Sequence, residues 1–238
     1  MSHTAPMLNA SSVADPTVVR SGGIRPSILV RRLLLIAAPV LAGIFAIIGT
    51  AADPAAGISG TEMWKILAEN PDPLQWKSFG LHWSYTFWAL PALGAWGFIR
   101  GRGAWLANVA GFFGIMGVAM LPGMLIVDFY DSAIGQVGGV ETVGAVYKAF
   151  DTMWAVPAMV LPGNVSLLVS LPLAAAAFWR AGLAGWMGFT AVILGSVALW
   201  FSGFLWWGAA AFTVAAILLS IDLARGLRRV DRAGAPAA

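Results

Sequence analysis

The stretch AWGFIRGRGAWLANVAGFFG, residues 95–114, decides how the chain folds. It lies within an apolar run from Leu81 to Val127 that only the segment Arg100-Gly-Arg-Gly103 interrupts. A continuous helix of these 47 residues would be roughly 70 Å long, more than twice the hydrocarbon thickness of a bilayer, about 30 Å. The charged, glycine-rich break must therefore be a turn, which gives membrane spans at about 81–99 and 104–127.

The composition indicates the same class of protein. The chain is 59% hydrophobic and only 11% charged, whereas a soluble domain carries about 25% charged residues. It contains no cysteine, which excludes disulfides, thiolate catalysis, iron–sulfur clusters and thiolate zinc sites. The net charge is +3, but the basic residues stand at the ends of apolar runs, so the sequence disfavours a nucleic-acid partner. No strand precedes a glycine-rich phosphate loop, which also disfavours a nucleotide cofactor.

The same reasoning divides the other apolar runs, and the sequence predicts an all-α polytopic membrane protein with six transmembrane helices. The expected spans are residues 28–51, 81–99, 104–127, 153–179, 183–201 and 204–223. Residues 1–27 are predicted to be a disordered cytoplasmic tail, residues 28–224 the transmembrane domain, and residues 225–238 a basic cytoplasmic tail. The alternative for the first apolar run is a cleaved signal peptide, but the long segment before it favours a retained span.

Charge predicts the orientation. With the N-terminus and the C-terminus cytoplasmic, all eleven arginines fall inside and all three lysines outside. Because short cytoplasmic loops carry an excess of basic residues, this distribution favours six spans over five or seven. The expected location is a bacterial-type plasma membrane, where the lipid bilayer is the main partner.

Two outer loops, residues 52–80 and 128–152, are long enough to hold structure of their own. The segment TEMWKILAEN, residues 61–70, predicts a short helix. In the second loop, apolar residues recur at every third position from Ile134 to Val146, which predicts a helix that lies in the interface or caps the bundle.

Small residues predict close packing in the third span. Ala107 and Gly111 stand four residues apart, a spacing that lets helix backbones approach each other, within one bundle or in a homo-oligomer or larger membrane complex. The hairpin at 95–114 also echoes residues 176–195, with Arg100 and Arg180 in matching places. The general need for arginine and glycine at inner turns explains this echo better than a parallel repeat does.

The most concentrated polar chemistry is expected at the outer ends of the second, third and fourth spans. The residues expected there are His82, Tyr85, Asp128, Tyr130, Asp131 and Asp151. His82 is the only histidine beyond the N-terminal tail, and a carboxylate beside it would raise its pKa and orient its ring. The candidate catalytic residues are His82, Asp128 and Asp151.

The sequence favours a simpler role for these side chains, which is anchoring of helix ends at the membrane interface. Asp151 is expected to begin the fourth helix and to cap its open N–H groups. One histidine near the membrane is too few for haem held by two histidines, and no spacing specifies a metal, so we predict no metal site. The cofactor stays unknown. Asn164 in the proline-rich fourth span is a further ligand-binding candidate, because Pro157, Pro162 and Pro172 make this span the best candidate for a broken helix that lines a cavity. The general abundance of proline and glycine in membrane helices explains these prolines better.

The order of basic tail, first span, outer loop with Asn-Pro-Asp-Pro (70–73) and His82-Trp83 at the start of the second span resembles a broad class of bacterial multi-span membrane proteins of unknown function. The resemblance implies no activity. We therefore expect a non-enzymatic bundle that binds a small molecule or lipid, or an accessory subunit of a membrane complex. The alternatives are a membrane enzyme or quinone-linked subunit acting on a lipophilic substrate at the outer leaflet, and a transporter, which the lack of charges within the spans disfavours.

Overall fold

The computed structural model describes residues 26–234, and this part of the chain consists of eight α-helices without a strand. Six are long: α1 (Pro26–Ala51), α3 (Pro71–Phe98), α4 (Ala104–Gly138), α6 (Ala155–Arg180), α7 (Trp186–Phe201) and α8 (Trp206–Gly234). Two are short: α2 (Thr61–Glu69) and α5 (Val140–Phe150). The predicted turns at Arg100–Gly103, 180–182 and 202–203 all separate helices, and the helix predicted within residues 61–70 is confirmed as α2.

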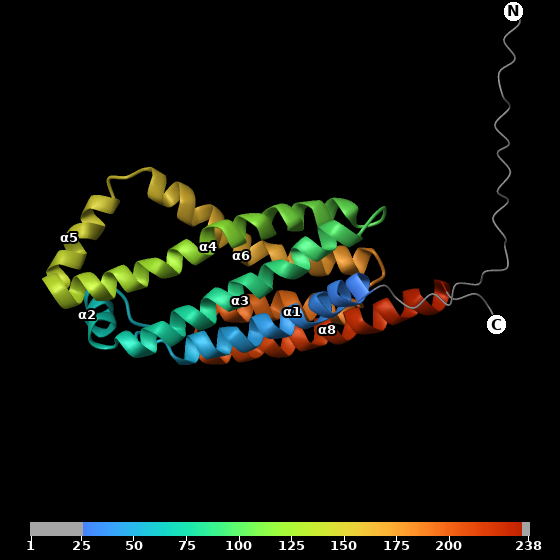
Figure 1. The fold of residues 1–238 in the computed structure, drawn as a ribbon, viewed down its shortest axis with the longest axis horizontal. Helices are drawn as coiled ribbons and strands as arrows, with labels where there is room; N and C mark the ends of the chain where they lie inside the picture. Colours follow the sequence, from blue (N-terminus) through green and yellow to red (C-terminus); the bar gives the residue numbers. More distant parts are fainter. Residues whose placement is uncertain (1–25, 235–238) are drawn as a thin grey trace, which may run out of the picture.

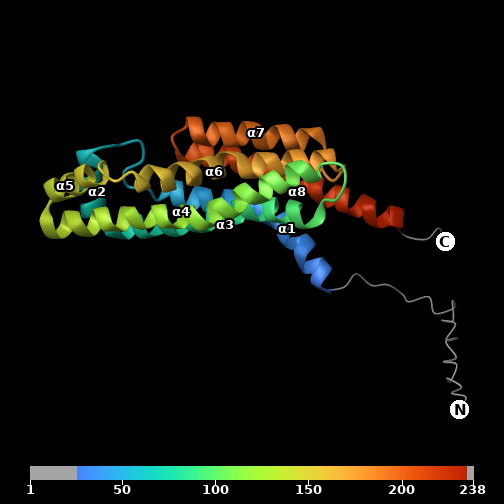
Figure 2. The same ribbon diagram turned by 90° about the horizontal axis from the view of Figure 1, so that it is seen from above.

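The long helices run roughly antiparallel and close into a ring (Figures 1 and 2). Consecutive members α1, α3, α4, α6, α7 and α8 pack against one another, α8 packs on α1, and α3 also contacts α6 across the ring. The start of α1, the α3–α4 and α6–α7 turns and the end of α8 lie at one end of the bundle, which we call the arginine end. The short helices α2 and α5 lie at the opposite end, here called the rim, and both pack on α4.

Four helices, α1, α4, α6 and α8, are long and apolar enough to cross a membrane, which supports a membrane-embedded helical protein. Helix α7 is apolar but has only 16 residues. Helix α3 has 28 residues, and its first three turns carry Asp72, Lys77 and His82.

Close backbone contacts between α1 and α3 depend on glycine. A Cβ atom added at Gly80 would lie 2.6 Å from the Cα atom of Gly49, so neither helix could keep its position with a larger residue there. The Ser84 hydroxyl donates a buried hydrogen bond of 2.8 Å to the Ala42 carbonyl across the same interface. Membrane helices associate through such small-residue contacts and interhelical hydrogen bonds.

The predicted small-residue face of the third span also packs closely. A Cβ atom at Gly111 would lie 2.7 Å from the Cβ atom of Trp96, and Ala107 is fully buried.

In the core, the Trp88 ring stacks on Phe212 of α8 with centroids 4.2 Å apart. At the arginine end, one carboxylate oxygen of Asp222 accepts the backbone N–H groups of Gly185 and Gly188, and so caps the start of α7.

Three expectations about the helices require correction. Helix α3 begins at Pro71, inside the predicted loop 52–80, because proline is favoured in the first turn of a helix and Asp72 suits its dipole. Helix α4 continues eleven residues beyond Val127, to Gly138, and takes up part of the predicted loop 128–152. Helix α6 is continuous through Pro162 and Pro172, so the broken helix considered there as the alternative is wrong.

The structure describes only one of the two predicted tails. Residues 1–25 of the N-terminal tail lie outside the described part of the chain. Residues 225–234 of the C-terminal tail extend α8 as a helix, and Asp231 near its end forms an ion pair of 2.7 Å with Arg32 of α1. The ends of the first and last long helices are therefore tied together.

Candidate functional site

An ion-pair network joins three segments of the chain at the rim. The Lys77 ammonium group lies 3.0 Å from an Asp128 carboxylate oxygen and 3.3 Å from one of Asp53. The side chain of Lys77 is 13% exposed, and those of Asp53 and Asp128 are 20% and 24% exposed. Lys77 thus links the residues after α1, the start of α3 and the last third of α4.

Electrostatics at Lys77 combine two opposing effects. Burial by itself lowers its pKa, because it disfavours the charged ammonium group. The charges of Asp128 and Asp53 outweigh burial, so the pKa of Lys77 lies above its ordinary value. The lysine is therefore positively charged at neutral pH and neutralises part of the negative charge of the rim.

A second polar contact at the rim connects α4 to α5. Asp131 is almost fully buried, and its carboxylate accepts a hydrogen bond of 2.8 Å from the Tyr147 hydroxyl. Burial raises the pKa of Asp131, although the bond from Tyr147 opposes this rise. Burial and the bond to Asp131 also raise the pKa of Tyr147. Next to them, the Ser132 hydroxyl donates to the Leu67 carbonyl at 2.8 Å, which fixes α2 against α4.

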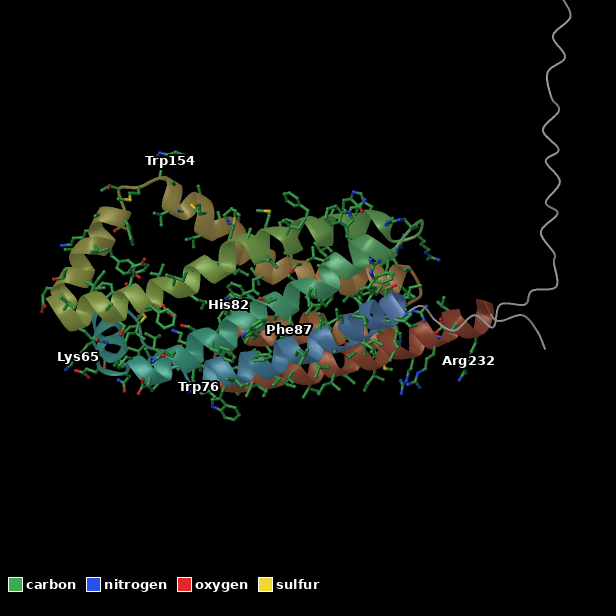
Figure 3. The ribbon with its side chains drawn as sticks, viewed as in Figure 1. Lys65, Trp76, His82, Phe87, Trp154 and Arg232 are labelled. Carbon is green, nitrogen blue, oxygen red and sulfur yellow. The ribbon has the colours of Figure 1, made fainter. Side chains whose placement is uncertain are left out.

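His82 lies apart from these carboxylates. It is exposed on α3, and its ring meets the Trp83 ring edge-on with centroids 5.8 Å apart (Figure 3). Within residues 26–234, no carboxylate oxygen comes within 4.0 Å of its ring nitrogens, and its side chain makes no hydrogen bond. The contact of His82 with Asp128 or Asp151 that the enzymatic alternative requires is therefore not formed.

His82 instead lines a groove of about 450 Å³ between α3 and α4, which we call the rim groove. Its lining residues are Gln75, Ser78, Phe79 and His82 from α3 and Leu125, Ile126 and Phe129 from α4. The α3 positions recur at intervals of three and four residues, so they share one face of the helix. The groove therefore combines aromatic and aliphatic walls with three polar side chains.

One polar group of the rim groove lacks a partner. The Ser78 hydroxyl is buried and makes no hydrogen bond to any described residue. Most buried polar groups in proteins are hydrogen-bonded, and leaving one unsatisfied costs about 1–3 kcal/mol. The Gln75 amide, by contrast, already donates to the Asp72 carboxylate at 3.1 Å. His82 is thus the groove's exposed hydrogen-bonding side chain, whereas the unpaired Ser78 hydroxyl oxygen lies in the groove wall with almost no exposed surface.

The remaining predicted site residues are spread over the rim and beyond it. Tyr85 packs against the main core, and Tyr130 is 63% exposed. Asp151 is exposed and forms the C-terminal cap of α5, so the prediction that it starts the next helix is wrong. Asn164 is half-buried on α6, one residue from the buried glycine at 163.

Sequence reasoning missed the two residues that organise the rim most strongly, Lys77 and Asp53, and also the Ser78 hydroxyl. Lys77 stands four residues before the expected start of the second span, and that placement was the available signal. No group of three or more metal-binding side chains occurs in the part of the chain that the structure describes. Comparison of the chain with protein-family models, curated proteins and solved structures finds no match.

Proposed function

We propose that the protein is a six-span membrane protein of a bacterial-type inner membrane, and that it binds an amphipathic small molecule or lipid in the rim groove without catalysing a reaction. The antiparallel ring supports the six spans, because α3 and α7 lie between helices that are long enough to cross. The described arginines all lie at the start of α1, in the α3–α4 turn, at the end of α6 or at the end of α8, which supports a cytoplasmic arginine end.

Interfacial aromatic residues support α7 as a span. Its 16 residues give a length of about 24 Å, short but close to the thinner hydrocarbon regions of membranes. Trp186 at its start is 65% exposed, and Trp206 and Trp207, just after the α7–α8 turn, are 60% and 49% exposed. Tryptophan favours the level of the headgroups, so these rings fit the two faces of the bilayer.

The unpartnered Ser78 hydroxyl carries the proposal of binding. A ligand with a hydrogen-bond acceptor, such as the carbonyl oxygen of a lipid ester or a quinone, would bond to the exposed His82 ring, and rotation of the Ser78 side chain out of the groove wall would bring its hydroxyl to the same ligand. Phe79, Phe129 and Leu125 would cover the apolar part of the same ligand. Sites for small molecules commonly combine apolar walls with a few polar groups in this way.

The ion pairs favour binding over catalysis. General acid–base chemistry needs a titratable group within about 3 Å of the proton that it moves, usually oriented by a partner. In the rim, Asp128 is paired with Lys77 and Asp131 with Tyr147, while His82 has no orienting carboxylate. An enzymatic role is therefore the alternative.

The test is titration of the purified full chain in neutral detergent with two probes, a monoacylglycerol and a quinone with a decyl tail. Tryptophan fluorescence follows binding, because Trp83 lies beside His82. We expect Ser78→Ala and His82→Phe each to weaken binding about fivefold to tenfold, the equivalent of one hydrogen bond of about 1 kcal/mol. The thermal stability of each variant is measured alongside.

The matched control is a variant in which a side chain fills a different groove of the bundle. Gly97 lines a separate groove between α1 and α3, and a Cβ atom there would meet no atom within 4 Å, so the Gly97→Leu side chain starts in open space and extends into that groove. Binding that Gly97→Leu weakens and Ser78→Ala does not would contradict the rim groove as the site. Chemical conversion of either probe by the wild type, lost in His82→Phe, would support the enzymatic alternative instead.

A further inference from the structure

A second candidate site lies at the opposite end of the bundle from the rim groove. The α3–α4 and α6–α7 turns enclose a cleft of about 410 Å³, which we call the arginine cleft. Its lining residues are Arg100, Arg102, Trp179, Arg180, Ala181 and Gly182. Two turns about eighty residues apart in the sequence thus bring three guanidinium groups to one cavity, and these are the turns whose sequences echo each other.

Glycine makes this approach of the two turns possible. Gly103, the residue just before α4, has a φ of +94°, which side-chain-bearing residues rarely adopt. A Cβ atom there would lie 2.8 Å from the Ala177 carbonyl oxygen and 3.2 Å from the Cβ atom of Arg180. The absence of a side chain at residue 103 therefore lets Arg180 lie beside the turn that carries the other two arginines.

The charges of the arginine cleft are not neutralised by described residues. Within residues 26–234, no carboxylate lies within 4.0 Å of Arg100, Arg102 or Arg180. One Arg100 nitrogen donates to the Trp96 carbonyl at 2.9 Å, which fixes that side chain and leaves its remaining N–H groups available. Holding three like charges at one cavity is unfavourable unless an anion joins them.

The cleft also has a rigid apolar wall. The Trp179 ring stacks on Phe189 of α7, with centroids 5.1 Å apart and planes at 5° to each other. This stack fixes the α6 end against α7, and with it the place of Arg180. The cleft is therefore a built feature of two packed turns whose lining carries no acidic residue, whereas the four arginines of α8 (residues 225, 228, 229 and 232) follow a single helix and line a groove that also contains the Asp222 carboxylate.

We propose that the arginine cleft binds a phosphate group. The planar guanidinium fork matches two oxygen atoms of a phosphate, and three such forks can surround its tetrahedral oxygens. The cleft is at the end of the bundle where the headgroups of one leaflet lie, so an anionic phospholipid is one source of the phosphate and a soluble phosphate compound is the other. This site is separate from the rim groove, and it does not depend on binding there.

The experiment compares two probes with the delipidated full chain in neutral detergent. Phosphatidic acid binding is followed by native mass spectrometry, with phosphatidylcholine as the zwitterionic reference, and inorganic phosphate binding by calorimetry. We expect the triple variant Arg100→Gln/Arg102→Gln/Arg180→Gln to weaken binding of at least one probe more than tenfold. Lysine at the same three positions keeps the charge but loses the fork, and should give an intermediate loss.

The matched control removes the same charge elsewhere at the same end. The triple variant Arg225→Gln/Arg228→Gln/Arg229→Gln on α8 is expected to change binding less than threefold. Equal losses in the two triple variants would show attraction by net charge alone and overturn the site, as would binding of neither probe by the wild type. If the arginine-cleft triple variant loses only phosphatidic acid binding, the cleft is a site for lipid headgroups. If it also loses binding of inorganic phosphate, soluble phosphate compounds can enter the cleft as well.

The three arginines are exposed, so the glutamine variants are expected to fold, which equal melting temperatures would verify. As a second approach that keeps all three charges, Gly103→Ala would displace the α3–α4 turn from Arg180. We expect this variant to weaken binding of the same probe. Unchanged binding by Gly103→Ala and by the arginine-to-glutamine triple variant would contradict the proposal.

Discussion

Replacement of Lys77 by methionine tests the ion-pair network of the rim. Methionine keeps most of the apolar stem and removes the cation between Asp53 and Asp128. Breaking a buried pair by removal of one partner costs about 3–5 kcal/mol. Because the two carboxylates are 20% and 24% exposed, water compensates part of this loss, and we expect a decrease of about 2–3 kcal/mol in the free energy of unfolding.

The assay is unfolding of the full chain in mixed detergent micelles, with increasing dodecyl sulfate and helicity as the readout. Lys65→Met is the control, since Lys65 is 66% exposed and lies 3.9 Å from Glu69 on the same short helix. An exposed pair of this kind contributes less than about 0.5 kcal/mol. Equal losses for Lys77→Met and Lys65→Met would refute the reasoning.

Two further measurements separate the charge effect from packing. In the Lys77→Met background, Asp128→Asn removes one unpaired carboxylate, and it should restore about 1 kcal/mol of the lost free energy of unfolding. The raised pKa of Lys77 also predicts a pH dependence. Its stabilisation is fully present below the unfolded pKa of about 10.5 and is lost as pH rises through the higher folded pKa, so the Lys77→Met variant should lack this alkaline decrease.

Three other predictions concern stability under the same assay. Gly80→Ala should lower the free energy of unfolding by about 1–3 kcal/mol, because its methyl group would meet the α1 backbone, whereas Gly97→Ala, on the same helix but in open space, should leave it unchanged or raise it. Similar effects of the two substitutions would contradict the close approach of α1 and α3. Because the pKa of Asp131 is raised in the folded state, its contribution to the free energy of unfolding declines as pH rises from about 4 through the folded pKa. Asp131→Asn, which keeps an acceptor for Tyr147, should remove that decline, and an unchanged pH profile of stability would count against this prediction. Asp222→Ala leaves two backbone amide groups at the start of α7 without an acceptor and should lower the free energy of unfolding by about 1–2 kcal/mol, and Asp222→Asn should lower it less. No loss of stability in either variant would argue against the cap.

Helix boundaries at the arginine end could be predicted from the sequence because local chemistry sets them there. A run too long for one membrane crossing must turn, and the glycines at 101, 103, 182 and 203 adopt the positive φ values that such turns need. At the rim the same approach failed, because apolarity marks where a helix enters the membrane and not where it ends. Helices α3 and α4 both extend well beyond their apolar segments into polar sequence.

The candidate site could be predicted only in part, because its contacts are between segments far apart in the sequence. The aromatic-rich segment around His82 marked it as a candidate, but its partners depend on which face of α3 it occupies. Lys77, five residues earlier, faces Asp53 and Asp128, while His82 faces the groove. A difference of five residues in a helix turns a side chain by about 140°, which spacing alone does not reveal without the positions of the neighbouring helices.

Cysteine labelling of intact cells tests the six-span arrangement most directly, and the chain has no cysteine of its own to interfere. Single substitutions at exposed positions, Ser59→Cys, Arg102→Cys, Thr152→Cys and Phe201→Cys, report on the loops on either side of α3, α4, α6 and α7. We expect an impermeant maleimide to label positions 59, 152 and 201 in intact cells, and position 102 only after the membrane is opened. Labelling of positions 59 and 102 from the same side would show that α3 does not cross, and would contradict the six-span arrangement.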